Sequence, residues 1–115
     1  MDDRLEKALE HANYKSTIEI QRKNLELRYQ NALLYSVDGG TFSANMELIN
    51  FVDFLIRNGQ EDAVIIDAKN KPIMVNDLVE FLAELSSVYF EASNQYFMEF
   101  EKLRKARSVK LALDI

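Results

Sequence analysis

The chain has 115 residues and a net charge of −5, with 48% hydrophobic and 29% charged residues. This length predicts one domain, and this composition excludes an intrinsically disordered chain. Because no cysteine is present, disulfide bonds, thiolate zinc sites and cysteine nucleophiles are excluded, and a reducing compartment such as the cytoplasm is favoured.

Residues 3–36 are predicted to form one long helix. Opposite charges four positions apart, at Glu19 and Lys23, are typical of an exposed helix face. The pair Gly39-Gly40 then predicts the end of the helix, since glycine readily takes the left-handed conformation found there. The inward stripe of this helix follows a three-and-four rhythm and comprises Leu5, Ala8, Ala12, Tyr14, Ile18, Leu25, Tyr29, Ala32 and Ser36.

A second, short helix is predicted over residues 44–57, with Thr41 or Ser43 as its N-cap. Asn58-Gly59 predicts its end. Its apolar residues fall nearly all round the helix, which is typical of a buried helix that is covered on several sides. They are Met46, Leu48, Ile49, Phe51, Val52, Phe54, Leu55 and Ile56.

Residues 63–75 are predicted to form a β-hairpin. Two short runs rich in β-branched residues, Ala63–Asp67 and Pro72–Val75, flank a polar connector. Pro72 has no N–H to donate, so it belongs at a sheet edge or at the start of its strand. Because an isolated hairpin is barely stable, this one is expected to pack on the helices.

The last predicted element is a long helix over residues 78–108. Asp77, followed three residues later by Glu80, gives it the start of a capping box. Its apolar stripe has the clearest helical periodicity in the chain. The stripe comprises Leu78, Phe81, Leu82, Leu85, Val88, Tyr89, Ala92, Tyr96, Phe100, Leu103 and Ala106.

The predicted fold is therefore mainly α, in the order helix, short helix, hairpin, helix. Each long helix has about 30 residues and a length of about 45 Å. A compact globule of this chain length has a radius of gyration of only about 13 Å. The long helices must therefore pair with each other as an extended helical hairpin, or pair with another chain as in a coiled coil. A homo-oligomer is the expectation.

The sequence contains no recognisable catalytic, cofactor or metal site, so the protein is predicted not to be an enzyme. His11 is the only histidine and lacks the spacing to acidic residues that metal sites use. Glu80 and Glu84 share one helical face, but no base or further ligand accompanies them, and a solvated acidic face explains them. Gly39-Gly40 lacks the sequence frame of a phosphate-binding loop.

No run of residues is long and apolar enough to span a membrane, and the N-terminus lacks the apolar core of a signal peptide.

The aromatic and basic end of the last helix is the strongest candidate interaction site. Residues 43–99 carry ten acids and three bases, a balance of −7, whereas residues 100–115 carry two acids and five bases, a balance of +3. Aromatic residues at helical spacing are usually core or interface, but beside basic residues they can also stack nucleobases. The candidate residues are Tyr96, Phe97, Phe100, Lys102, Leu103, Arg104, Lys105 and Arg107.

Two segments, Leu33–Ser36 before the glycine pair and Tyr96–Ser108, give the chain a layout that resembles small helical proteins of contractile-tailed (myovirus-type) phages. This resemblance implies a virion, assembly or host-interaction role, in the host cytoplasm or the virion, and implies no functional residue.

The leading hypothesis is thus a non-enzymatic protein that self-associates and binds other proteins through the apolar stripes of its long helices. The alternative, less favoured because an acidic body repels phosphate, is a nucleic-acid accessory factor that uses the basic C-terminal helix.

Overall fold

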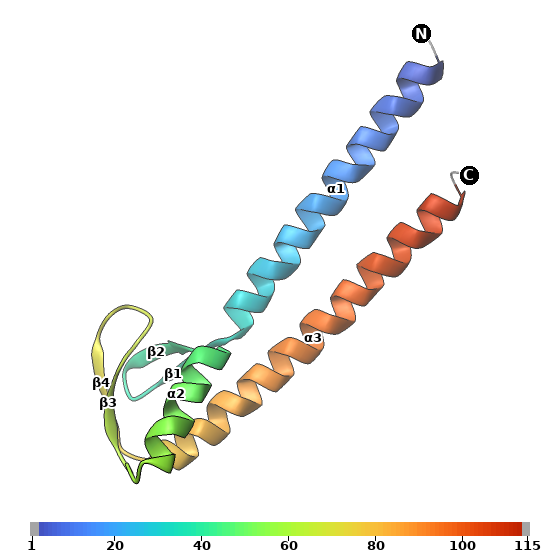
Figure 1. Ribbon diagram of the computed structural model, residues 1–115. Helices are drawn as coiled ribbons and strands as arrows, with labels where there is room; N and C mark the ends of the chain where they lie inside the picture. Colours follow the sequence, from blue (N-terminus) through green and yellow to red (C-terminus); the bar gives the residue numbers. More distant parts are fainter. Residues whose placement is uncertain (1–2, 114–115) are drawn as a thin grey trace. The chain divides into compact units, whose positions relative to one another are not determined.

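The computed structural model describes the backbone of residues 3–113 and the side chains of residues 3–106. This part of the chain contains three helices and two separate two-stranded antiparallel sheets (Figure 1). The predicted mainly helical class is confirmed. The chain divides into two compact units. The helical unit comprises Met1–Arg28 and Tyr96–Ile115, and the mixed unit comprises Tyr29–Gln95.

Helix α1 (Asp3–Ala32) is shorter than predicted, because residues 33–36 leave the helix and enter a hairpin. Strand β1 (Leu34–Val37) pairs with strand β2 (Gly40–Ser43) across a two-residue turn. Both turn residues have positive φ, 53° at Asp38 and 81° at Gly39. Such a turn matches the twist of the flanking strands, and Asp-Gly is one of its preferred sequences. The glycine therefore forms a hairpin turn and not a helix end.

Helix α2 (Met46–Arg57) begins two residues later than predicted. Its N-cap is Asn45, whose side-chain oxygen accepts a hydrogen bond from the Leu48 N–H at 2.8 Å. The predicted caps, Thr41 and Ser43, were wrong because both residues belong to strand β2.

The prediction that α2 is buried on several sides is also wrong, because only one face of the helix packs against the core. Val52 is fully buried. On the other face, three large apolar side chains are about half exposed or more: Met46 at 47%, Phe51 at 46% and Phe54 at 59%.

The predicted hairpin over residues 63–75 is confirmed. Strands β3 (Ala63–Ile66) and β4 (Pro72–Val75) pair in antiparallel register, and Pro72 begins its strand as expected. The turn between them contains Asn70 with a φ of 62°, a conformation that asparagine tolerates better than most residues.

Asp67, at the end of β3, holds this hairpin and β2 together. Its buried carboxylate accepts hydrogen bonds from three backbone N–H groups: Lys71 at 2.8 Å and Lys69 at 2.9 Å on Oδ1, and Thr41 at 3.1 Å on Oδ2. In return, the Ala68 N–H donates to the Thr41 carbonyl oxygen at 2.8 Å. The N–H of Lys71 is the main cause of a lowered pKa at Asp67, with those of Thr41 and Lys69 adding to it and burial opposing it.

Helix α3 (Leu78–Leu113) begins as predicted and continues beyond residue 108. The Asp77 carboxylate accepts a hydrogen bond from the Glu80 N–H at 3.0 Å, which confirms the predicted cap. Its first turns close the core of the mixed unit, where the Phe42 and Phe81 rings meet edge to face with centroids 5.0 Å apart. The buried residues of this core are Phe42, Ala44, Val52, Ile65, Val75, Leu78, Phe81 and Leu85.

In the helical unit, α1 and α3 lie side by side and antiparallel. Arg28 forms an ion pair with Glu99 at 3.3 Å, while Ile18, ten residues earlier, shares a hollow with Leu103 and Arg104. Ile18 and Leu25 of the predicted inward stripe are buried. The expected pairing of the two long helices is therefore present in this unit. The prediction of the inward stripe was wrong for five other members, which are exposed: Leu5, Ala8, Ala12, Ala32 and Ser36.

Candidate functional site

The aromatic residues predicted as an interaction site lie on two different faces of α3. Tyr96 and Phe100 are half-buried, and their rings stack with centroids 6.1 Å apart and an interplanar angle of 16°. Leu103, also half-buried, lines hollows together with Ile18 and Leu25 of α1. Phe97 lies about 100° round the helix from Tyr96 and is 64% exposed. Most of this set therefore packs the two helices together, and Phe97 alone is strongly exposed.

The predicted basic residues of this helix are accompanied by acidic ones. Lys102, Arg104 and Lys105 are exposed. Arg104 donates two hydrogen bonds to Glu101, at 2.9 and 3.0 Å, which lower the pKa of the glutamate and raise that of the guanidinium. The side chain of Arg107 lies outside the described residues. Because carboxylates cancel part of the positive charge, this segment is a poor match for a phosphate backbone.

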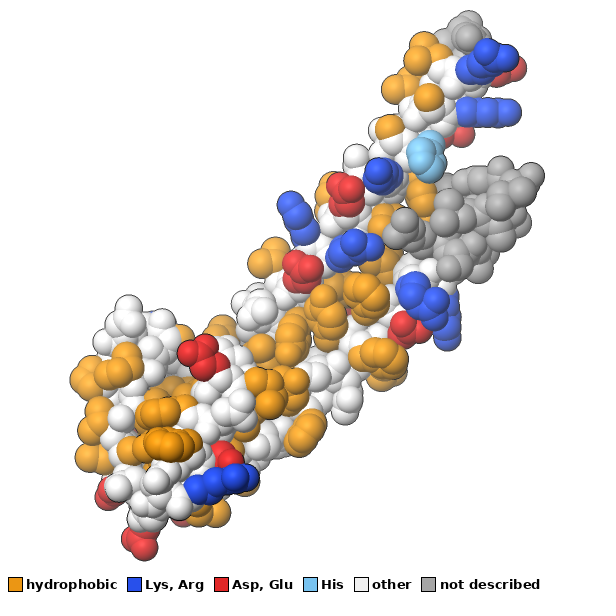
Figure 2. Space-filling view, in the orientation of Figure 1, with side chains coloured by type: hydrophobic (Ala, Val, Ile, Leu, Met, Phe, Trp, Pro, Cys, Tyr) orange, Lys and Arg blue, Asp and Glu red, His pale blue; other side chains and the backbone are white. Residues whose placement is uncertain are grey.

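A second apolar stripe on α1 was missed in the sequence, where Leu5 was assigned to the inward stripe. Leu5, Leu9, Ile20 and Leu27 are 50%, 48%, 59% and 62% exposed. They are separated by four, eleven and seven residues, spacings close to whole numbers of helical turns, so they share one side of the helix. The buried residues Ile18 and Leu25 fall on the opposite side. Figure 2 shows hydrophobic side chains exposed along α1 among charged ones.

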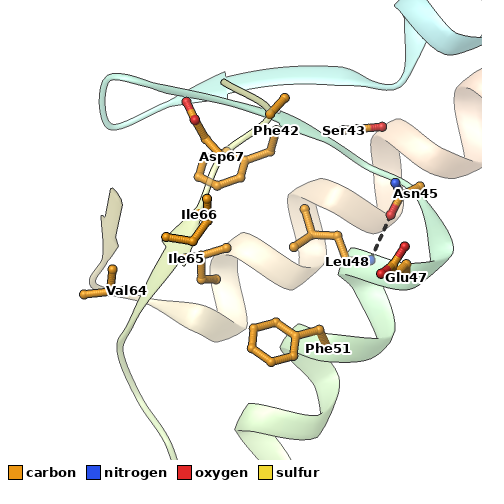
Figure 3. A pocket seen from close by; sticks show the side chains of 11 residues that line it. Phe42, Ser43, Asn45, Glu47, Leu48, Phe51, Val64, Ile65, Ile66 and Asp67 are labelled. Atoms are coloured by element: carbon orange, nitrogen blue, oxygen red, sulfur yellow. Dashed lines mark hydrogen bonds between the residues drawn. The ribbon is translucent and has the colours of Figure 1, made fainter. Parts of the chain in front are cut away.

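The mixed unit contains an open groove of about 380 Å³ between strand β3 and helix α2 (Figure 3). Apolar side chains from three elements lie along it, with polar and acidic groups at its ends. Its lining comprises Phe42, Ser43, Asn45, Glu47, Leu48, Phe51, Val64, Ile65, Ile66, Asp67 and Ala68. Sequence reasoning missed this groove because its two walls are far apart in the chain.

The two units differ in charge. Residues 29–95 carry ten acids and three bases, a balance of −7, whereas residues 3–28 of α1 carry five acids and six bases. The mixed unit therefore repels another copy of itself, and α1 is close to neutral.

Within residues 3–106, no group of three histidine, cysteine or acidic side chains is placed to hold a metal ion. His11 is exposed on α1, and Glu80 is exposed on α3. Among the described helices, none is long and apolar enough to cross a membrane.

Comparison with protein-family models, curated proteins and solved structures yields no match to this chain.

Proposed function

We propose that this protein is a non-enzymatic assembly protein, and that two copies associate through the second apolar stripe of α1. One observation carries the proposal: α1 has apolar residues on two opposite sides, and α3 covers only one of them. A helix that is apolar on two sides is typical of a helix with two neighbours. The missing neighbour is a second copy of the chain.

The charge of α1 supports a second copy as the partner. With five acids and six bases over residues 3–28, two such helices can approach without net repulsion. The mixed unit, at −7, would resist the same approach. Self-association is therefore most favourable where α1 meets α1.

The exposed stripe also sets the expected strength of the association. Covering the exposed half of a Leu or Ile side chain gains about 1 kcal/mol, so four such residues on each of two chains gain about 8 kcal/mol. This gross gain would correspond to micromolar affinity, and the lost freedom of the two partners weakens it further. With at least about 4 kcal/mol lost in this way, about 4 kcal/mol or less remains, so the dimer should form in the high-micromolar to millimolar range.

Sedimentation velocity over a range of protein concentrations tests the proposal. The full chain should move from monomer to dimer as the concentration rises, and Ile20→Lys should remain monomeric. Phe90→Lys is the matched control, since Phe90 is 63% exposed on the other long helix. If Phe90→Lys abolishes the dimer and Ile20→Lys does not, the stripe on α1 is not the assembly surface.

The predicted resemblance to proteins of contractile-tailed phages stays a prediction. An assembly protein agrees with it, but the first segment on which it rests, Leu33–Ser36, ends in a hairpin strand and not in a helix. The alternative of a nucleic-acid accessory factor is less favoured, because Glu101 pairs with Arg104 within the segment that would bind phosphate, and Glu99 adds a second carboxylate there.

A further inference from the structure

The hydrogen-bond pattern of the β3–β4 hairpin determines which backbone groups of β3 face outward. The Asp67 N–H donates to the Lys71 carbonyl oxygen at 2.9 Å, so these two residues occupy a hydrogen-bonded position of the ladder. Hydrogen-bonded and non-hydrogen-bonded positions alternate in an antiparallel pair. Ile66 and Val64, one and three residues before Asp67, are therefore non-hydrogen-bonded. Their N–H and C=O groups point away from β4.

The chain itself already uses this outer edge at one point. The Ala68 N–H, two residues beyond Ile66 and on the same side of the strand, donates to the Thr41 carbonyl oxygen at 2.8 Å. Strand β2 does not otherwise pair with β3, because the two hairpins form separate sheets. Among the described residues, the backbone N–H groups of Val64 and Ile66 have no hydrogen-bond acceptor. An edge of this kind is a template for another strand.

The groove lies along this same edge. In Figure 3, Phe51 and Leu48 of α2 face β3 across it, and Ile65 lies beneath. Its volume of about 380 Å³ is within the range of pockets that bind ligands, roughly 300–1,000 Å³. An extended segment placed there would bond to the strand edge through its backbone and set alternate side chains against α2.

We propose that the outer edge of β3 is a strand-addition site, and that its occupant is an extended segment of a partner protein in which apolar residues alternate with Lys or Arg. The apolar residues fit the lining of the groove. The basic residues complement its acidic surroundings, because Glu47 lies on the α2 wall and Glu61 and Asp62 immediately precede β3. The site shares no residue with the stripe of α1, so strand addition at β3 and self-association through α1 can be tested independently.

A second copy of the hairpin is a poor occupant of this site. Two β3 edges would have to approach to about 4.8 Å, the spacing of paired strands. Helix α2 stands beside that edge in each copy and carries Phe51 into the approach path. A single extended segment meets no such obstacle, and the −7 balance of the mixed unit disfavours two copies at this face.

Fluorescence anisotropy with a labelled eight-residue peptide of alternating valine and lysine tests the site on the full chain. The valine–lysine peptide should bind, a valine–glutamate peptide should bind about tenfold more weakly or not at all, and N-methylation of alternate amides should abolish binding. Phe51→Ala should weaken binding about tenfold. Phe54→Ala is the matched control, since Phe54 is exposed on α2 but does not line the groove, and it should bind as the unchanged chain does.

Amide hydrogen exchange measured by NMR gives the direct readout. On addition of the valine–lysine peptide, the amides of Val64 and Ile66 should become protected, and those of the α1 stripe should not change. Failure of the peptide to bind, binding that survives N-methylation, or equal effects of the two phenylalanine variants would overturn the proposal. Loss of the dimer in Phe51→Ala would also overturn it, since the groove would then hold a second copy.

Discussion

Replacing Gly40 by alanine should test the packing of the two hairpins against each other. A Cβ at Gly40 would lie 2.7 Å from Cγ1 and 3.2 Å from Cδ1 of Ile73, and 3.1 Å from Cε2 of Phe42. The Ile73 side chain must therefore move to admit it. Overpacking of this kind lowers the free energy of unfolding by about 1–3 kcal/mol. Alanine has less conformational freedom than glycine in the unfolded chain, which raises the free energy of unfolding by about 0.4–1 kcal/mol. Gly40→Ala should thus lower the free energy of unfolding by about 1–2 kcal/mol.

The same contact makes the effect dependent on the residue at position 73. In an Ile73→Ala background both clashing carbons of that side chain are gone, so Gly40→Ala should become nearly neutral. In an Ile73→Val background a γ-carbon remains, and most of the cost should persist. Urea denaturation of the single and double variants, with m unchanged, measures the coupling. Equal costs of Gly40→Ala in all three backgrounds would refute the packing described here.

Three further outcomes are expected. Leu85→Ala should lower the free energy of unfolding by about 2.7–5 kcal/mol, because the side chain is fully buried. Val79→Ala, at an exposed position of the same helix, should lower it by less than about 0.5 kcal/mol. Similar losses for the two variants in urea titrations would contradict the assignment of Leu85 to the core. Since the pKa of Asp67 is lowered in the fold, its stabilising effect is present above the ordinary value of 3.8 and is lost as pH falls through the lowered pKa. Denaturation midpoints measured against pH should show this acid-induced loss in the unchanged chain and much less of it in Asp67→Asn, and two parallel curves would argue against the role given to Asp67. Single-stranded DNA should bind weakly and with a shallow salt dependence. Arg104→Ala should leave this binding unchanged, because Arg104 is paired with Glu101. A steep salt dependence in anisotropy titrations would support the nucleic-acid alternative instead.

The elements with strong local patterns were predictable from the sequence. The start of α3 followed from Asp77 and Glu80, and the β3–β4 hairpin followed from β-branched runs around a polar connector. Each of these patterns is read within a few residues. Their confirmation shows that local capping and strand signals decide these parts of the fold.

The first hairpin was missed because two signals conflict at residues 33–36. The helical rhythm of Tyr29, Ala32 and Ser36 continues the stripe of α1, whereas Asp38-Gly39 favours a two-residue hairpin turn. The turn prevails because the strands that it joins place Phe42 in the core, against Phe81. That gain depends on a partner far along the chain, which a local pattern cannot show.

The candidate surfaces were predicted only in part. The interaction site predicted at the aromatic residues of α3 stays a prediction, because its inward and outward members cannot be distinguished without knowing where α1 lies. The second stripe of α1 follows the helical spacing of Leu5, Leu9, Ile20 and Leu27, but the prediction of a single inward stripe placed Leu5 on the wrong side of the helix. The groove beside β3 depends entirely on tertiary packing.

Disulfide trapping at the centre of the α1 stripe tests the central proposal most directly. Ser16 is exposed and lies eleven residues from both Leu5 and Leu27, so in an in-register pair of helices, parallel or antiparallel, the two copies of this position face each other. The chain has no cysteine, so Ser16→Cys introduces a single reporter, and Ser87→Cys, exposed on α3, is its control. Mild oxidation at about one millimolar protein, in the concentration range expected for the dimer, should join Ser16→Cys into covalent dimers and leave Ser87→Cys largely monomeric. Equal trapping of both variants, or trapping of Ser87→Cys alone, would contradict assembly through α1.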